Sequence, residues 1–314
     1  MKKPLIILTG PTAVGKTELS IALAKRIGGE IISADSMQVY KYMDIGSAKI
    51  MPAEQQGIPH HLIDLIMPEH EFHVVEFQRR AKKCIEEIYE RGNIPIIVGG
   101  TGFYIQAVLY DIDFTTSRCN DDFRKELEQL KESHGACYLH EMLEKVDPNA
   151  AKQIHANNSK RVIRALEFYH ETGKQISQHN EAEKHKTSPY DFAYFVLNDE
   201  RDYLYERINQ RVDIMLSQGL VDEVKMLKEK GYTRALVSMQ GLGYKELFAY
   251  LDNECTLEEA VYLIKRDSRH FAKRQLTWFK REREVIWLDK STYQRDNKQL
   301  LERILEILDE KDIC

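Results

Sequence analysis

A glycine loop near the N-terminus restricts the fold of this chain more than any other feature. The residues Gly10-Pro11-Thr12-Ala13-Val14-Gly15-Lys16-Thr17 follow the pattern G-x-x-x-x-G-K-T, between an apolar run at residues 5–9 and a helical pattern at residues 16–27. Strand, glycine loop and helix in this order are typical of a loop whose backbone N–H groups bind phosphate, with Lys16 as a point charge and Thr17 as a Mg²⁺ ligand. A chance match in a turn would not explain both neighbours. The loop does not identify the phosphorylated molecule.

Alternation of short apolar runs and amphipathic stretches predicts an α/β fold, in which helices flank a P-loop NTPase-like parallel sheet. We expect strands at residues 5–9, 30–34, 94–98, 192–197 and 285–288, and helices at residues 16–27, 74–91, 202–218 and 257–283. A chain of 314 residues exceeds the usual size of a single core, which favours two lobes. We therefore predict a catalytic core of residues 1–110 and 199–314. Residues 111–198 should form a helical insertion, with helices at 120–133, 136–145 and 158–172.

Composition and charge restrict the environment more than the activity. Hydrophobic residues make up 43% of the chain, charged residues 30%, and the net charge is −5, so any nucleic-acid surface must be a local patch. The five cysteines are scattered without a Cys-x-x-Cys pair, which favours a reducing cytoplasm over a disulfide framework or a zinc site. The apolar run at residues 5–8 is too short to cross a membrane, so we expect a cytoplasmic monomer without a membrane partner.

A carboxylate follows the second predicted strand, in the segment Ser33-Ala34-Asp35-Ser36-Met37-Gln38. In open α/β sheets ligands lie beyond the carboxyl ends of the strands, so Asp35 should lie beside the phosphate loop. There it could deprotonate a nucleophile as a general base. Alternatively, it could hold a Mg²⁺-bound water or cap the next helix.

The second strand-end loop considered, Gly99-Gly100-Thr101-Gly102, follows the strand predicted at residues 94–98 and lacks the acidic residue with which a kinase usually organises Mg²⁺. The Thr101 hydroxyl could instead donate a hydrogen bond to a diphosphate oxygen and assist its departure as a leaving group. The alternative is that the glycines only form a tight turn.

Positive charge is concentrated in residues 265–283, which contain eight Lys or Arg residues and two acidic ones. Arg266, Arg269 and Lys273 follow helical spacing and could track a phosphate backbone, although a solvated helix face would look the same. Lys160, Arg161 and Arg164 form a second, shorter group within the insertion. Arg207 and Arg211 could reach the phosphate site or form structural salt bridges.

The chain resembles the bacterial tRNA dimethylallyltransferases, also called tRNA isopentenyltransferases, over nearly its whole length. The matching segments include GPTAVGKT at residues 10–17, SADSMQVYKYMDIGSAK at 33–49, PHHLID at 59–64 and GGTGFY at 99–104. Further matches are KRVIRALE at 160–167, LYERINQRVDIML at 204–216, QGLGYKE at 240–246 and FAKRQLTWF at 271–279. The zinc finger typical of the eukaryotic members is missing.

The resemblance implies transfer of a dimethylallyl group from dimethylallyl diphosphate to the exocyclic amine of the adenine just 3′ of the anticodon. It implies that Asp35 is the general base, that Thr101 contacts the diphosphate bridging oxygen, and that residues 10–17 and Arg211 bind the diphosphate with Mg²⁺. The insertion is expected to contact the tRNA anticodon stem-loop. The implied tRNA contacts are Asp35, Ser36, Met37, Gln38, Thr101, Arg124, Lys160, Arg161, Val162, Ile163, Arg164, Lys273, Arg274 and Gln275.

Two other enzyme classes share part of this pattern. A P-loop kinase of a small molecule would have the same loop and Asp35, but gives no reason for the two basic groups. An adenylate isopentenyltransferase would use similar chemistry on a free nucleotide, whereas the insertion and the basic helix favour a large RNA acceptor.

Overall fold

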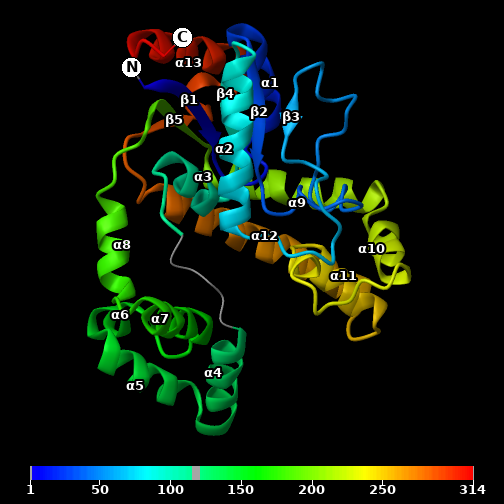
Figure 1. Cartoon of the computed structure of the whole chain (residues 1–314). Helices are drawn as coiled ribbons and strands as arrows, with labels where there is room; N and C mark the ends of the chain where they lie inside the picture. Colours follow the sequence, from blue (N-terminus) through cyan, green and yellow to red (C-terminus); the bar gives the residue numbers. More distant parts are fainter. Residues whose placement is uncertain (1, 115–120, 314) are drawn as a thin grey trace. The chain divides into compact units, whose positions relative to one another are not determined.

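The structure is a computed structural model that describes residues 2–114 and 121–313. Its centre is a six-stranded sheet in the order β3-β2-β4-β1-β5-β6, with every neighbouring pair parallel (Figure 1). This arrangement confirms the predicted α/β class. The strands are β1 (Lys3–Thr9), β2 (Gly29–Ala34), β3 (His60–His61), β4 (Ile94–Gly99), β5 (Tyr190–Asn198) and β6 (Val285–Asp289).

Successive side chains of β1 point to opposite faces of the sheet and are nearly all apolar, so both faces of the sheet must be covered by helices. Ile6 and Leu8 share a core with Leu19 of α1 and Leu300 of α13, whereas α2 packs against β2, β4 and α3. The helices of this unit are α1 (Lys16–Ile27), α2 (Val74–Glu90), α3 (Gly102–Leu109), α9 (Arg201–Ser217), α10 (Leu220–Glu229), α11 (Tyr244–Leu251), α12 (Leu257–Phe279) and α13 (Asn297–Glu310). Two 3₁₀ helices, η1 (Ser238–Gln240) and η2 (Lys290–Tyr293), complete it.

Residues Tyr110–Ser188 form a separate compact unit. Its helices are α4 (Asp121–His134), α5 (Ala136–Val146), α6 (Pro148–Gln153), α7 (Ser159–Thr172) and α8 (Ile176–Lys184). Leu127, Leu143 and Leu166 lie in its core. The unit ends before the predicted boundary at residue 198, because β5 pairs with β1 and β6 and so belongs to the sheet.

Most predicted elements differ from the structure only at their ends. The helix predicted at residues 257–283 ends at Phe279, because the chain then turns through Glu284, with φ of 56°, into β6. Cys84, Cys137 and Cys255 are free thiols, while Cys119 and Cys314 lie outside the described residues. Within the described ranges, each helix is too short or too polar to cross a membrane.

A buried carboxylate joins three elements at the start of β2. Glu30, only 3% exposed, accepts two hydrogen bonds of 2.8 Å from the Arg91 guanidinium, one of 2.7 Å from Asn93, and lies 2.7 Å from His61 Nε2. The hydrogen bonds from Arg91 are the main reason why the pKa of Glu30 falls to about 2. The ionised carboxylate thus ties β2 to β3 and to the turn after α2.

We predict that Glu30→Gln lowers the free energy of unfolding at pH 7 by about 1–3 kcal/mol, because it removes charge-assisted hydrogen bonds. A carboxylate with a depressed pKa stabilises the fold above its unfolded pKa, and this contribution disappears as pH falls from 4.5 towards about 2. Urea unfolding from pH 7 to pH 3 should therefore show a shrinking difference between variant and wild type. Glu90→Gln, at the exposed end of α2, is the control, and a pH-independent difference would contradict this account.

Candidate active site

The carboxyl ends of three neighbouring strands open into one large cavity. Because β2, β4 and β1 are adjacent in the sheet, the loops that follow them converge. The cavity has a volume of about 790 Å³, and its other walls come from α9, residues 240–245 and α12. The predicted site residues that line it are Thr12, Ala13, Gly15, Lys16, Thr17, Asp35, Ser36, Met37, Gln38, Thr101, Arg211, Arg274 and Gln275.

The phosphate loop connects β1 directly to the first turn of α1. Gly15, with φ of 94°, is the N-cap residue, so Lys16 is the first residue of the helix. Lys16 Nζ donates hydrogen bonds of 2.9 Å to the carbonyl oxygens of Gly10 and Pro11. Gly10, Pro11 and Val14 are buried and are not among the cavity-lining residues. These three residues therefore support the loop from the side that faces away from the cavity.

Two cations, Lys16 of the loop and Arg211 of α9, line the cavity. Burial lowers the pKa of Lys16 to about 7, Arg211 acts in the same direction, and Asp35 opposes both. Burial also lowers the pKa of Arg211, while Asp35 raises it. An anion bound here would relieve the repulsion between the two cations. Neither Arg207 nor Arg211 forms a salt bridge within the described chain. The alternative that these two arginines form structural salt bridges is therefore wrong, and both side chains line the cavity instead.

Asp35 is oriented by the backbone that follows it. Its Oδ1 accepts hydrogen bonds from the backbone N–H groups of Met37 at 2.8 Å and Gln38 at 3.3 Å. The alternative that Asp35 caps a helix is wrong, because its Oδ1 closes a turn and the next helix of the chain is α2. These bonds also fix the side chain, which leaves Oδ2 as the oxygen that can accept a proton in the cavity.

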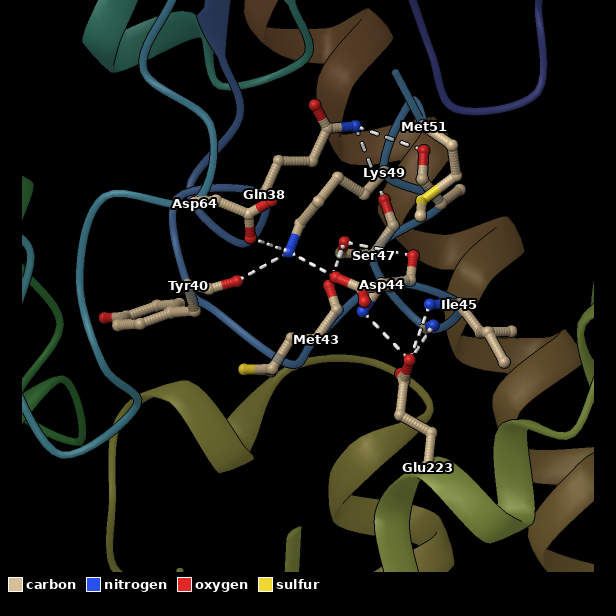
Figure 2. A network of polar contacts seen from close by, with 12 residues as sticks. Gln38, Tyr40, Met43, Asp44, Ile45, Ser47, Lys49, Met51, Asp64 and Glu223 are labelled. Carbon is tan, nitrogen blue, oxygen red and sulfur yellow. Dashed lines mark hydrogen bonds and ion pairs between the residues drawn. The ribbon is translucent and has the colours of Figure 1, made fainter. Parts of the chain in front are cut away.

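A buried network holds the loop after β2 in place (Figure 2). Lys49, whose side chain is 1% exposed, donates to the Tyr40 carbonyl at 2.7 Å and pairs with Asp44 at 2.6 Å and Asp64 at 2.5 Å. Glu223 of α10 accepts the backbone N–H groups of residues 44–46 at 2.7–3.1 Å. Sequence reasoning missed Glu223, because no local pattern marks a carboxylate that binds a distant loop.

Gln38 is connected to the same network. Its Oε1 accepts a 3.0 Å hydrogen bond from Ser33 Oγ. Its Nε2 donates longer bonds to the carbonyls of Ser47 and Ala48 (Figure 2). Both amide protons are thus directed at the protein itself. The one remaining acceptor site is a lone pair on Oε1.

The glycines on either side of Thr101 allow α12 to approach the end of β4. A Cβ atom at Gly100 would lie 2.1 Å from Gln275 Nε2, and one at Gly102 would lie 2.2 Å from the Trp278 ring. Gln275 Nε2 donates to the Gly100 carbonyl at 3.0 Å, while its Oε1 accepts the Thr12 N–H at 2.9 Å. The segment is therefore more than a tight turn, since it lets one buried amide join α12 to the phosphate loop.

The cations of α12 divide into two groups. In the first half, Lys265 pairs with Asp213 at 2.6 Å, Arg266 pairs with Asp267 at 2.8 Å, and Arg269 donates to an Asn209 oxygen at 2.6 Å. Of the three residues in the predicted stripe, Arg266 and Arg269 thus already have partners within the protein. In the second half, Lys273 and Arg274 line a concavity of about 210 Å³ with Thr277, Trp278 and Arg281, the last of which lies beyond the end of the helix. The candidate RNA surface of α12 is this second half.

The predicted RNA contacts of the insertion lie on and beneath α7. Lys160 and Arg161 are exposed and Arg164 is half-buried, whereas Val162 and Ile163 are buried in the core of the unit. The expectation of RNA contacts through those last two side chains is therefore corrected, since they pack against neighbouring helices.

Arg124 of α4 is committed to a buried partner. Its Nε lies 3.5 Å from Glu167, a carboxylate that is 1% exposed. Burial raises the pKa of Glu167, and the charge of Arg124 opposes that change. Arg124 therefore has a structural role beside Glu167, whether or not it also contacts tRNA.

The cavity offers few protein ligands for a metal. Among the described residues, no group of three His, Cys, Asp or Glu side chains could hold a metal ion. Mg²⁺ needs only one or two protein oxygens when phosphate oxygens supply others, and Thr17 and Asp35 both line the cavity. The residues thus fit a Mg²⁺ that arrives with a diphosphate.

Comparisons with known proteins agree on one family. Residues 38–282 match the family described as IPP transferase. A tRNA dimethylallyltransferase of Lachnoclostridium phytofermentans is 62% identical over 99% of both chains. A second, from Carboxydothermus hydrogenoformans, is 53% identical over 98% of this chain and 96% of its own.

Solved structures lead to the same family. A tRNA isopentenylpyrophosphate transferase from Bacillus halodurans has a TM-score of 0.74 and 47% identity, covering 99% of this chain and 98% of its own. A eukaryotic dimethylallyltransferase acting on tRNA has a TM-score of 0.79 and 32% identity, covering 91% of this chain and 74% of its own. With a phosphate loop, a strand-end carboxylate and a basic helix around one cavity, this chain belongs to the IPP transferase family.

Proposed function

We propose that this protein is a tRNA dimethylallyltransferase. It transfers the dimethylallyl group of dimethylallyl diphosphate to the exocyclic N6 amine of the adenine on the 3′ side of the anticodon. The observation that carries this proposal is a single cavity that contains both a phosphate loop and a carboxylate fixed at the end of an adjacent strand. The names of relatives that match nearly the whole chain support the same activity.

The proposed reaction forms one C–N bond and breaks one C–O bond. The adenine amine attacks C1 of the dimethylallyl group, and the bridging oxygen leaves with the bonding electrons as pyrophosphate. Asp35 Oδ2 accepts the proton that the amine loses. Thr101 donates a hydrogen bond to the departing oxygen, and the loop N–H groups with Lys16 and Arg211 stabilise the charge that develops there. The adenine must leave its stack to enter the cavity.

A bound Mg²⁺ would neutralise part of the diphosphate charge, with the Thr17 hydroxyl as its proposed protein ligand.

The RNA-binding residues are proposed to be the second half of α12 and, in the insertion, Lys160, Arg161 and Arg164. We further propose that the protein works as a monomer in the cytoplasm, where its free thiols are stable.

The proposal is tested by nucleoside analysis of tRNA incubated with the protein and dimethylallyl diphosphate. We expect dimethylallyl adenosine next to the anticodon and no product with free AMP. Modification of AMP but not of tRNA would indicate an adenylate isopentenyltransferase. Phosphotransfer from ATP without isoprenoid transfer would indicate a kinase.

Asp35→Asn should lower kcat by roughly 10²–10⁴-fold, because the amide keeps an acceptor for the backbone N–H groups but cannot take a proton. Pyrophosphate binding should not weaken, because a negative charge near the loop is removed. Single-turnover kinetics and calorimetry measure the two effects. The control is Asp202→Asn at the exposed start of α9, and an unchanged rate for the Asp35 variant would refute its role as base.

Thr101→Val should lower kcat by roughly 10²-fold with little change in the KM for dimethylallyl diphosphate, because the leaving oxygen loses a donor. The backbone carbonyl of Thr101, which accepts hydrogen bonds from Tyr104 and Ile105 at the start of α3, is retained. Steady-state kinetics with the exposed Thr292→Val as control would test this. A rise in KM alone would show that Thr101 only binds substrate.

Replacing Lys160, Arg161 and Arg164 by Gln should weaken tRNA binding and lower its salt slope by about one per lost phosphate contact. Filter binding at salt concentrations from about 50 to about 200 mM gives the slope of log affinity against log salt concentration. A control variant loses the same charge at three other exposed lysines of the unit, Lys131, Lys145 and Lys174. Equal slopes for both variants would show that the α7 cations face away from RNA.

A further inference from the structure

Three cationic side chains donate to four carbonyl oxygens of the phosphate loop, and two of the three lie outside the glycine motif. Lys16 and Arg207 line the cavity, whereas Lys290 does not and so contacts the outer face of the loop. Lys16 donates to the carbonyl oxygens of Gly10 and Pro11, and Arg207 Nε donates to that of Ala13 at 2.9 Å. The fourth, the Val14 carbonyl, accepts a 3.3 Å hydrogen bond from Lys290 Nζ.

Lys290 reaches this position from the opposite end of the chain. It is the first residue of η2, directly after β6, and is only 7% exposed. Its Nζ also donates to Asn297 Oδ1 at 3.0 Å, and Asn297 in turn donates to Glu18 in the first turn of α1 at 2.8 Å. A Cβ atom added to Gly15 would lie 3.0 Å from Lys290 Nζ. The ammonium therefore lies against the junction between loop and helix.

Burying the Lys290 ammonium costs desolvation free energy. Burial lowers the pKa of Lys290, as does the charge of Arg207, while Asp199 and Glu18 raise it. Asp199 is itself paired with Arg295 at 3.1 Å, so it does not neutralise Lys290 alone. An apolar side chain of similar size would avoid this desolvation.

Peptide geometry connects Lys290 to the ligand side of the loop. In a trans peptide the C=O and N–H bonds point in opposite directions. A donor that holds the Val14 carbonyl on the outer face therefore directs the Gly15 N–H to the other face, and Gly15 lines the cavity. The same ammonium also adds a positive charge behind the anion site.

We propose that Lys290 is a positioning residue for diphosphate binding, which holds the Val14–Gly15 peptide so that its N–H faces the diphosphate. This inference rests on the proposed function, because that function makes a diphosphate the ligand. The ligand class is the diphosphate group, either in a diphosphate ester or as the free pyrophosphate product.

The test measures pyrophosphate binding by calorimetry in the full-length protein. Lys290→Met should weaken the Kd for inorganic pyrophosphate roughly tenfold, the usual effect of one charge-assisted hydrogen bond. Lys290→Arg, which keeps the charge, should recover most of this loss. The matched control is Lys298→Met on α13, an exposed lysine whose replacement removes the same charge. It should bind pyrophosphate as the wild type does.

Two further readouts separate positioning from a general loss of structure. In steady-state kinetics, Lys290→Met should raise the KM for dimethylallyl diphosphate roughly tenfold and leave the KM for tRNA unchanged. Wild-type pyrophosphate affinity in Lys290→Met, or an equal loss of affinity for pyrophosphate and tRNA, would overturn the inference. Failure of the wild type to bind pyrophosphate would instead refute the proposed function.

Discussion

The fold depends on keeping one short turn, between β1 and α1, in a conformation that presents its N–H groups to an anion. In that conformation Lys16, Arg207 and Lys290 donate to the carbonyl oxygens of Gly10, Ala13 and Val14. The glycine motif supplies backbone freedom, but the donors come from the start of α1, from α9 and from the turn after β6. The phosphate loop is thus a tertiary structure rather than a local one.

Helix α12 connects this turn to the surface proposed to bind RNA. Gln275 joins the Thr12 N–H and the Gly100 carbonyl, and the next turn of the helix carries Trp278 against Gly102. Lys273 and Arg274 precede Gln275 directly, so the cations proposed to bind RNA and the amide that joins α12 to the loop lie on the same helix. A contact that shifts α12 would also move the loop that binds the diphosphate.

Much of the site was predictable because its residues lie in segments that follow predicted strands of a parallel sheet. Asp35 and Thr101 each follow a strand end, Thr17 follows the loop at the end of β1, and parallel strands bring such positions together. The residues that hold these groups were not predictable. Glu223 and Lys290 each act on a backbone segment more than a hundred residues away, and a single charged residue in a helix or turn has no local signature. Val162 and Ile163 were misassigned for a related reason: a matching segment does not tell which of its side chains face the core.

The central claim is that the loop holds a diphosphate as the leaving group of a transfer to RNA. The most direct measurement quantifies pyrophosphate during a single turnover with dimethylallyl diphosphate, with and without tRNA. This account predicts one pyrophosphate for each modified adenosine, no release without RNA, and no cleavage of ATP supplied in its place. ATP cleavage together with the absence of RNA-dependent pyrophosphate release would contradict it.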